Sequence, residues 1–150
     1  MSFDWKSLQN GSDIRGVAVD GIESEPITLS QEIVKNIAWA FSSWLKNKVK
    51  KQDVSISIGH DSRISANELK QAVIHGLINN NCSIGDAGLA STPAMFMSTI
   101  FEEYKYDGAI MLTASHLPFN RNGMKFFTKF GGLEKQDISE ILDLAESKKY

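Results

Sequence analysis

The sequence has few of the features that mark several large classes of protein. One cysteine, Cys82, stands among its 150 residues, so an internal disulfide is impossible, and the apolar stretch around it favours a packed thiol over a reactive one. The formal net charge of -2 gives no overall basic field for nucleic acid. Any anion site must therefore be a local concentration of Arg, Lys and His side chains.

Long hydrophobic runs and targeting signals are also lacking. The longest uncharged stretch, 87–101, is shorter than the ~20 apolar residues that a membrane span needs, and it contains Ser, Thr and Pro. Residues 1–13 contain no basic segment followed by an apolar run, so we expect no signal peptide. These absences favour a cytoplasmic protein with small partners, without a membrane or nucleic-acid role.

The length of 150 residues suits one ordinary domain. Along the chain, the spacing of the apolar residues alternates between the patterns of strands and of helices. Strand patterns occupy the segments 17–19, 54–59, 82–91, 109–112 and 123–130. Helical patterns occupy the segments 28–45, 65–77, 92–101 and 136–149. Thr28 with Gln31, and Ser65 with Glu68, have the spacing of capping boxes, which predicts two of the helix starts.

Alternating strands and helices predict an α/β fold, a layered sandwich in which a mostly parallel, mixed β-sheet of about four strands lies between helices. Ligand sites in such folds gather in the loops beyond the strand ends. Three polar clusters are expected there: Asp13 with Arg15 in a loop at 10–16, the segment 60–63, and the segment 115–125. We predict that at least two of these clusters meet.

The segment 107–132 (DGAIMLTASHLPFNRNGMKFFTKFGG) combines a buried-strand pattern with a hydroxyl group and several cations. Its first apolar run stops just before Ser115, and three basic side chains, His116, Arg121 and Lys125, but no carboxylate follow. The dipeptide of Asn122 and Gly123 is typical of a turn into a second strand. The loop is therefore expected to suit an anion.

Ser115 alone is most simply a turn residue. A serine hydrolase would place its nucleophile in a Gly-x-Ser-x-Gly elbow, but Thr113 and Leu117 flank Ser115 and no glycine run for an oxyanion hole is evident, which disfavours acyl transfer. A phosphorylated serine carries about -1.5 to -2 charges near neutral pH and needs cations and hydrogen-bond donors around it. The cationic surroundings match that need.

The other polar residues also have plain structural interpretations. His116 can be a hydrogen-bonded structural imidazole, and Arg63 with Asp61, like Arg15 with Asp13, can be a local pair that staples a loop. Each of these signals is weak on its own.

Three motifs together resemble the α-D-phosphohexomutases. TASHLPFNRNGMKFF resembles the family's phosphoserine signature, usually T-A-S-H-N-P followed by N-G-x-K, and SDIRG and GHDSR are similar to its other two first-domain loops. The motifs occur in the family's order across nearly all of the chain. The resemblance implies that residues 1–150 are a single domain, the first and phosphoserine-bearing domain of a four-domain phosphoglucomutase or phosphomannomutase whose remaining domains are absent.

The resemblance also implies roles for individual residues. Ser115 matches the serine that holds the transferable phosphoryl group, and His116 lies beside it. Lys125 and Arg15 match residues that assist proton transfer or steady the reacting oxygens. Leu117 departs from the family's usual Asn, so a contact by an amide side chain is not expected there.

A second group of residues is assigned by resemblance to substrate or phosphate binding. It contains Arg63 and His60, for which a supporting role is expected, and Asn122. Mg²⁺ is expected on the phosphoryl group of Ser115, with its other ligands in an acidic loop of a domain that this chain lacks.

The reaction implied is an intramolecular phosphotransfer between hexose 1-phosphate and hexose 6-phosphate, in which phospho-Ser115 and a sugar bisphosphate intermediate exchange a phosphoryl group. Glucose or mannose bisphosphate is expected as activator, and the partners are hexose phosphates and the enzyme's remaining domains. The isolated chain is expected to be inactive. A non-catalytic phosphosugar-binding or regulatory module of the same fold is the alternative that the sequence leaves open.

Overall fold

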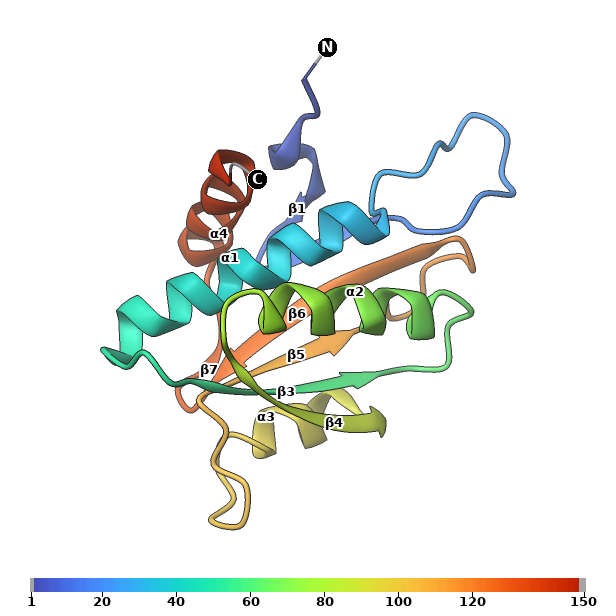
Figure 1. The fold of residues 1–150 in the computed structure, drawn as a ribbon. Coiled ribbons are helices and arrows are strands. Elements are labelled where there is room, and N and C mark those ends of the chain that lie inside the picture. The colour runs from blue at the N-terminus through green and yellow to red at the C-terminus, as the bar shows by residue number, and fades with distance from the viewer. Residues whose placement is uncertain (1, 149–150) are drawn as a thin grey trace.

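The computed structural model describes residues 2–148, so Lys149, the last residue of the predicted C-terminal helical segment, lies outside the described range. Short two-residue strands accompany the main elements (Figure 1). The helices and strands of the described chain are, in order, η1 (Trp5–Leu8), β1 (Gln9–Asn10), β2 (Asp13–Val17), α1 (Gln31–Val49), β3 (Ser55–His60), α2 (Ala66–Ile78), β4 (Ser83–Leu89), α3 (Thr92–Met97), β5 (Gly108–Leu112), β6 (Arg121–Thr128), β7 (Gly131–Gly132) and α4 (Lys135–Ser147).

The described strands form one seven-stranded sheet in the order β1-β2-β6-β5-β3-β4, with β7 paired to β6. Strand β3 is parallel to both β4 and β5, whereas β5, β6, β2 and β1 pair antiparallel. The predicted α/β sandwich with a mixed sheet is confirmed. The sheet contains more than the about four strands predicted, partly because β1 and β7 have two residues each and show no alternating pattern.

Helices cover the two faces of this sheet unequally (Figure 1). The main core lies between the sheet and α1, α2 and α4, and includes Phe41, Ile58, Phe126 and Ile141. The short helix α3 covers a smaller cluster on the other face, which consists of Met95, Ala109, Met111 and Phe127. All five residues of β5 are buried, as expected for a central strand with both faces covered.

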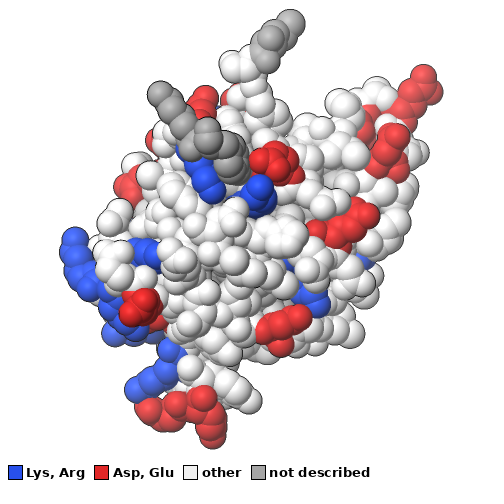
Figure 2. Space-filling view, viewed as in Figure 1, with Lys and Arg blue, Asp and Glu red and all other residues white. Residues whose placement is uncertain are grey.

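Charged side chains are mixed in sign over the face shown in Figure 2, apart from lysines gathered at the end of α1. Lys46 and Lys48 lie in the last turn of that helix, and Lys50 is its C-cap. Positive charge there is favoured by the helix dipole, whose negative end lies at the C-terminus. Among the described residues, no helix is long and apolar enough to cross a membrane.

The two predicted capping boxes place one helix start correctly and one incorrectly. The N-cap of α1 is Ser30, whose Oγ accepts a hydrogen bond from the Ile33 amide at 3.3 Å. The prediction of Thr28 as this cap was wrong, because the Thr28 hydroxyl instead accepts from the Val17 amide at 3.0 Å. Ser65 is the N-cap of α2 as predicted, but its side chain makes no capping hydrogen bond.

The pairing of β2 with β6 corrects two predictions about local structure. Residues 13–17 form a strand, so Arg15 lies within β2 and not in a loop before a strand at 17–19. Gly123 pairs with Arg15 inside β6, so the predicted Asn-Gly turn is wrong. A Cβ added at Gly123 would lie 2.4 Å from the Ile14 carbonyl oxygen and 2.8 Å from that of Thr113. Glycine is needed here for close backbone approach.

Cys82 packs against the main core and is half-buried. Burial is the largest influence on its thiol and raises the pKa, although the Ser42 hydroxyl and the charge of Lys46 act in the opposite direction. A raised pKa leaves less of the reactive thiolate at neutral pH. The interpretation of Cys82 as a packed thiol is consistent with this environment.

We predict that Gly123→Ala lowers the free energy of unfolding by about 1–3 kcal/mol, because the new methyl group would overlap two backbone carbonyl oxygens. Urea denaturation followed by circular dichroism measures the change. Gly132→Ala is a matched control, since the nearest atom to an added Cβ there is 3.8 Å away. Equal stability of the two variants would contradict the proposed steric role of Gly123.

We also predict that Cys82 reacts with iodoacetamide more slowly than a free thiol such as glutathione at about pH 8, because burial disfavours the thiolate. Intact-mass spectrometry of timed samples gives the rate. The same chain unfolded in urea should react at the free-thiol rate. A folded rate equal to the unfolded rate would show that the environment of Cys82 does not suppress its reactivity.

Candidate active site

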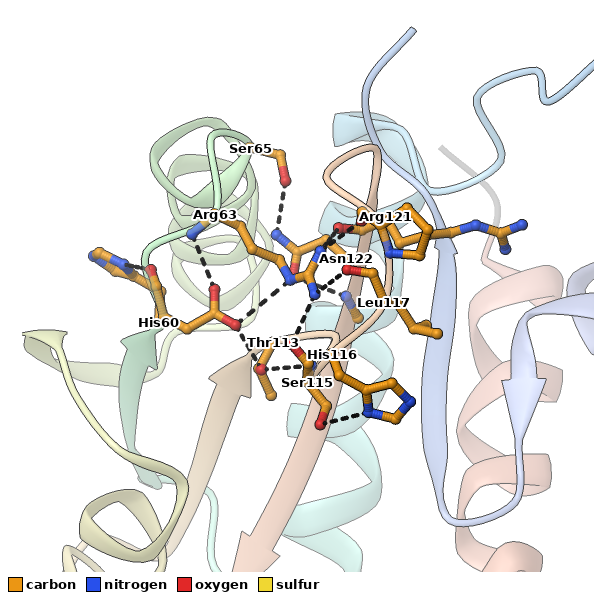
Figure 3. A network of polar contacts seen from close by, with 12 residues as sticks. His60, Arg63, Ser65, Thr113, Ser115, His116, Leu117, Arg121 and Asn122 are labelled. Carbon is orange, nitrogen blue, oxygen red and sulfur yellow. Dashed lines mark hydrogen bonds and ion pairs between the residues drawn. The ribbon is translucent and has the colours of Figure 1, made fainter. Parts of the chain in front are cut away.

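Strand β5 leads directly to Ser115, an exposed residue at the end of the sheet. Ser115 has a φ of 54°, in the left-handed region that non-glycine residues rarely adopt. Its amide donates to Thr113 Oγ1 at 3.1 Å, and its Oγ lies 3.3 Å from Nδ1 of His116 (Figure 3). The hydroxyl and the imidazole predicted to lie beside each other are therefore in contact.

A cavity of about 200 Å³ opens beside Ser115, and we call it the Ser115 cavity. Its lining residues come from β2, the start of α3, the segment after β5, and β6: Asp13, Arg15, Thr92, Thr113, Ser115, Met124 and Lys125. Strand alternation explains the position of Lys125, because Met124 and Phe126 on either side of it belong to the main core. Lys125 consequently projects to the face that the short helix α3 covers.

Two cations and one carboxylate lie in the wall of the Ser115 cavity. Lys125 Nζ is 3.0 Å from Asp13 Oδ1, and an Arg15 guanidinium nitrogen is 3.7 Å from Asp13 Oδ2. The three side chains are only partly exposed, at 33% for Lys125, 23% for Arg15 and 15% for Asp13. One formal positive charge therefore remains uncompensated among these groups. Lys and Arg side chains in such positions form strong charge-assisted hydrogen bonds with phosphate oxygens.

Arg63 does not line this cavity. Its guanidinium instead donates to four backbone carbonyls of the segment 113–121, which we call the Ser115 loop (Figure 3). The acceptors are Pro118 at 2.7 Å, Leu117 at 2.8 Å, Ser115 at 2.9 Å and Arg121 at 3.0 Å. The Arg63 side chain is 10% exposed. Its hydrogen bonds to Leu117 and Arg121 are partly buried, whereas those to Pro118 and Ser115 lie at exposed positions.

Asp61 connects Arg63 to Thr113, the first residue of the serine motif. Asp61 Oδ1 accepts from the Arg63 amide at 3.1 Å, and Oδ2 lies 3.6 Å from Arg63 Nε. The same Oδ2 accepts from the Thr113 hydroxyl at 2.6 Å, and that hydroxyl in turn accepts from the Ser115 amide. Sequence reasoning treated Asp61 as a simple loop staple and gave Thr113 no role. No sequence pattern indicated the contact between Asp61 and Thr113, because it depends on the β3–β5 pairing, which places the ends of these strands side by side.

The other two residues expected to bind substrate or phosphate lie away from the Ser115 cavity. His60 ends β3, its Nδ1 lies 2.8 Å from the Asp61 carbonyl oxygen, and its ring points away from Ser115 (Figure 3). Asn122 is fully buried. Its amide nitrogen donates to Ser65 Oγ at 2.7 Å, and its side-chain oxygen accepts from the Gly123 amide at 2.8 Å.

The prediction that at least two polar clusters meet is confirmed. Arg63 contacts the Ser115 loop, and Lys125 contacts Asp13. The Arg121 side chain, although part of the same cationic segment, forms an ion pair with Glu25 and points away from Ser115 in Figure 3. Among the described residues, the cations that line the cavity are therefore Arg15 and Lys125, and the His116 ring contacts Ser115 Oγ.

The described residues contain no group of three or more His, Cys, Asp and Glu side chains placed to hold a metal ion. Asp13 is the one carboxylate among the described residues that line the Ser115 cavity, and it is ion-paired with Lys125. These residues alone therefore do not form a magnesium site.

A family model described as phosphoglucomutase/phosphomannomutase, alpha/beta/alpha domain I, matches residues 6–150. The chain belongs to the α-D-phosphohexomutase family. The resemblance inferred from the three motifs is thereby confirmed, and the match is to the first domain of that family.

Known phosphohexomutases are similar over most of this chain. A phosphoglucomutase/phosphomannomutase of Thermococcus kodakarensis is 35% identical over 127 residues, which cover 84% of this chain and 27% of that protein. A phosphoglucosamine mutase of Prochlorococcus marinus is 38% identical over 121 residues, covering 78% of this chain and 25% of that protein. The chain spans about a quarter of the length of these relatives. Because its relatives are mutases, the family is enzymatic.

The fold is also shared with solved structures. A phosphoglucomutase/phosphomannomutase family protein from Burkholderia thailandensis has a TM-score of 0.78 with this chain, over 93% of this chain and 30% of that one, at 24% identity. At this identity the likeness concerns the fold alone.

We predict that Asn122→Ala destabilises this phosphohexomutase domain by about 1–3 kcal/mol, because the buried Gly123 amide and the Ser65 hydroxyl lose their partner. Urea denaturation measures the free energy of unfolding. Asn67→Ala, at an exposed position of α2, is the control and should change it by less than about 0.5 kcal/mol. An Asn122 variant as stable as the wild type would indicate that this side chain is not a structural support.

Proposed function

We propose that this domain carries the phosphoserine of a phosphohexomutase, and that Ser115 holds the transferable phosphoryl group. One observation carries the proposal: the exposed Ser115 lines a cavity into which β2 brings Arg15 and β6 brings Lys125. A phosphoserine needs nearby cations and donors, and phosphoryl transfer depends mainly on positioning and charge neutralisation. The site contains the groups for both tasks.

The proposed substrates are hexose 1-phosphates and hexose 6-phosphates, with glucose or mannose phosphates as the preferred sugars. Relatives of this chain bear the names phosphoglucomutase/phosphomannomutase and phosphoglucosamine mutase, which supports the class of substrate. The family match over residues 6–150 includes Arg15, Ser115 and Lys125. The presence of all three side chains in one cavity supports a reacting domain over a domain that merely binds a sugar phosphate.

In the proposed reaction, the bond between phosphorus and Ser115 Oγ breaks as a sugar hydroxyl oxygen forms a new bond to the same phosphorus. The proton of that hydroxyl is transferred to Ser115 Oγ by the end of the step. The resulting sugar bisphosphate reorients, and its other phosphoryl group returns to Ser115 while the proton moves in the reverse direction. The product is the isomeric sugar monophosphate, and the phosphoserine is regenerated.

The charged side chains of the cavity, and His116 beside Ser115, have proposed parts in this exchange. Arg15 and Lys125 neutralise charge on the transferring group and steady the reacting oxygens, as preorganised cations do in phosphoryl transfer. His116, whose Nδ1 is 3.3 Å from Ser115 Oγ, is placed to share the proton of the serine hydroxyl. Asp13 holds Lys125 and Arg15 at the cavity wall before the phosphoryl group is present.

Magnesium would neutralise further charge on the phosphoryl group when bound. Since the described residues do not form a magnesium site, we propose that the phosphoryl group on Ser115 is the ligand of this domain and that the other ligands lie outside the chain. Complete turnover is accordingly proposed to require the remaining domains of a four-domain enzyme, with this chain inactive alone. Glucose or mannose bisphosphate would load Ser115, and the enzyme would act in the cytoplasm.

We predict that Ser115→Ala in the complete mutase reduces turnover to the background of the assay, because no hydroxyl remains to carry the phosphoryl group. A coupled assay of glucose 6-phosphate formation from glucose 1-phosphate measures turnover. Ser83→Ala, at an exposed position where β4 begins, should retain wild-type turnover.

The same proteins provide a direct chemical readout. After incubation with glucose 1,6-bisphosphate, peptide mapping of the wild type should locate phosphate on the peptide that contains Ser115, and the Ser115→Ala protein should show none. Undiminished turnover of Ser115→Ala, or phosphate on a different residue of the active wild type, would overturn the assignment.

A further inference from the structure

The Ser115 loop carries a cluster of backbone carbonyls that face one side chain. Two successive turns bend the loop, in which the Leu117 amide donates to the Ala114 carbonyl and the Arg121 amide donates to the Pro118 carbonyl, both at 3.0 Å. This path turns four carbonyl oxygens toward the position of the Arg63 guanidinium. Carbonyl oxygens carry a partial negative charge, so four of them placed close together repel one another unless a cation or water lies between them.

The Arg63 guanidinium suits this cluster in charge and in shape. Its planar fork directs several N–H groups in fixed directions, so its two terminal nitrogens can serve two carbonyls each. Lysine could not reproduce this geometry, because its ammonium is a compact charge on a flexible stem. Since the donors of both terminal nitrogens are engaged by the loop, Arg63 is poorly placed to bind a phosphoryl group in the cavity as well.

Both backbone polar groups of Ser115 belong to the same hydrogen-bond network. Its carbonyl accepts from Arg63, and its amide donates to Thr113, whose hydroxyl donates to Asp61. Asp61 in turn accepts a hydrogen bond from the Arg63 backbone amide and forms an ion pair with the Arg63 side chain, which closes the network. The residue held at both ends is the one with the left-handed φ of 54°, a conformation that persists only where its surroundings impose it.

We propose that Arg63, Asp61 and Thr113 are positioning residues that hold Ser115 in its left-handed conformation and so direct its phosphoryl group into the Ser115 cavity. The inference rests on the proposed function of Ser115, and it gives Arg63 a role other than binding substrate phosphate. The network comes from the β3–α2 connection and from the segment after β5, so the support of the serine is separate from the cations on β2 and β6 that face the reacting group.

The first test measures the loop in the 150-residue chain and does not depend on any catalytic activity. Hydrogen–deuterium exchange followed by mass spectrometry compares the wild type with Arg63→Lys and Thr113→Val. Both variants should exchange the amides of Ser115, Leu117 and Arg121 about tenfold faster or more, with little change in α1. Thr113→Ser keeps the hydroxyl and should recover most of the protection.

Arg121→Lys is the matched control for the change from arginine to lysine. Its side chain pairs with Glu25 and not with the loop carbonyls, so exchange in the Ser115 loop should stay near the wild-type rate. If Arg63→Lys and Thr113→Val fold but leave loop exchange unchanged, the positioning role is wrong. If Arg63→Lys does not fold, Thr113→Val decides the question alone.

The second test uses steady-state kinetics of the complete mutase with glucose 1-phosphate. Because misplacement of a reacting group lowers the rate of transfer, Arg63→Lys and Thr113→Val should lower kcat about tenfold to a hundredfold and leave KM within about twofold. Thr113→Ser should restore most of kcat. An increase in KM at unchanged kcat would identify Arg63 as a substrate-phosphate ligand and overturn the proposal.

Failure of the proposed function would be recognised separately. If the wild-type complete protein neither turns over a hexose phosphate nor gains phosphate on Ser115, the mutase assignment fails, and the exchange measurement alone then decides whether Arg63 and Thr113 hold the loop. If the wild type is active while the exchange and kcat of both variants match it, the mutase assignment stands and the positioning inference fails.

Discussion

The candidate site depends on the parallel pairing of β3 with β5. That pairing sets His60 opposite Leu112, so the residues that follow the two strands emerge side by side. Asp61 consequently reaches the Thr113 hydroxyl, and Arg63 reaches the loop beyond it. Because β3 and β5 lie in the middle of the sheet with both faces covered, the core that stabilises the fold also determines the position of the serine loop.

The opposite wall of the cavity depends on the second pairing, between β2 and β6. These strands approach so closely that a side chain at Gly123 would overlap backbone atoms, and the approach places Asp13 of β2 near Lys125 of β6. The site thus has two parts of different chemistry. One part holds the backbone of Ser115 by hydrogen bonds, and the other presents Arg15 and Lys125 to whatever the serine carries.

In the proposed function, this division lets one domain of the α-D-phosphohexomutase family supply one part of the reacting site. The proposed phosphoryl carrier and its neutralising cations lie within one α/β layer, whereas the described residues offer no cluster of metal ligands. In the proposed function, placing the carrier on a rigid sheet and the metal ligands elsewhere would leave room for the proposed sugar bisphosphate to reorient.

The sequence by itself determined the class of fold, the central buried strand before Ser115, and the three motifs that indicate the family, because periodicity and side-chain chemistry are local properties. It did not reveal that Arg15 lies within a strand or that Asn122 is buried, since both depend on the pairing of β2 with β6. The partners of Arg63 were decided by tertiary structure alone. Every residue has a backbone carbonyl, so no sequence pattern shows which four of them will converge on one guanidinium.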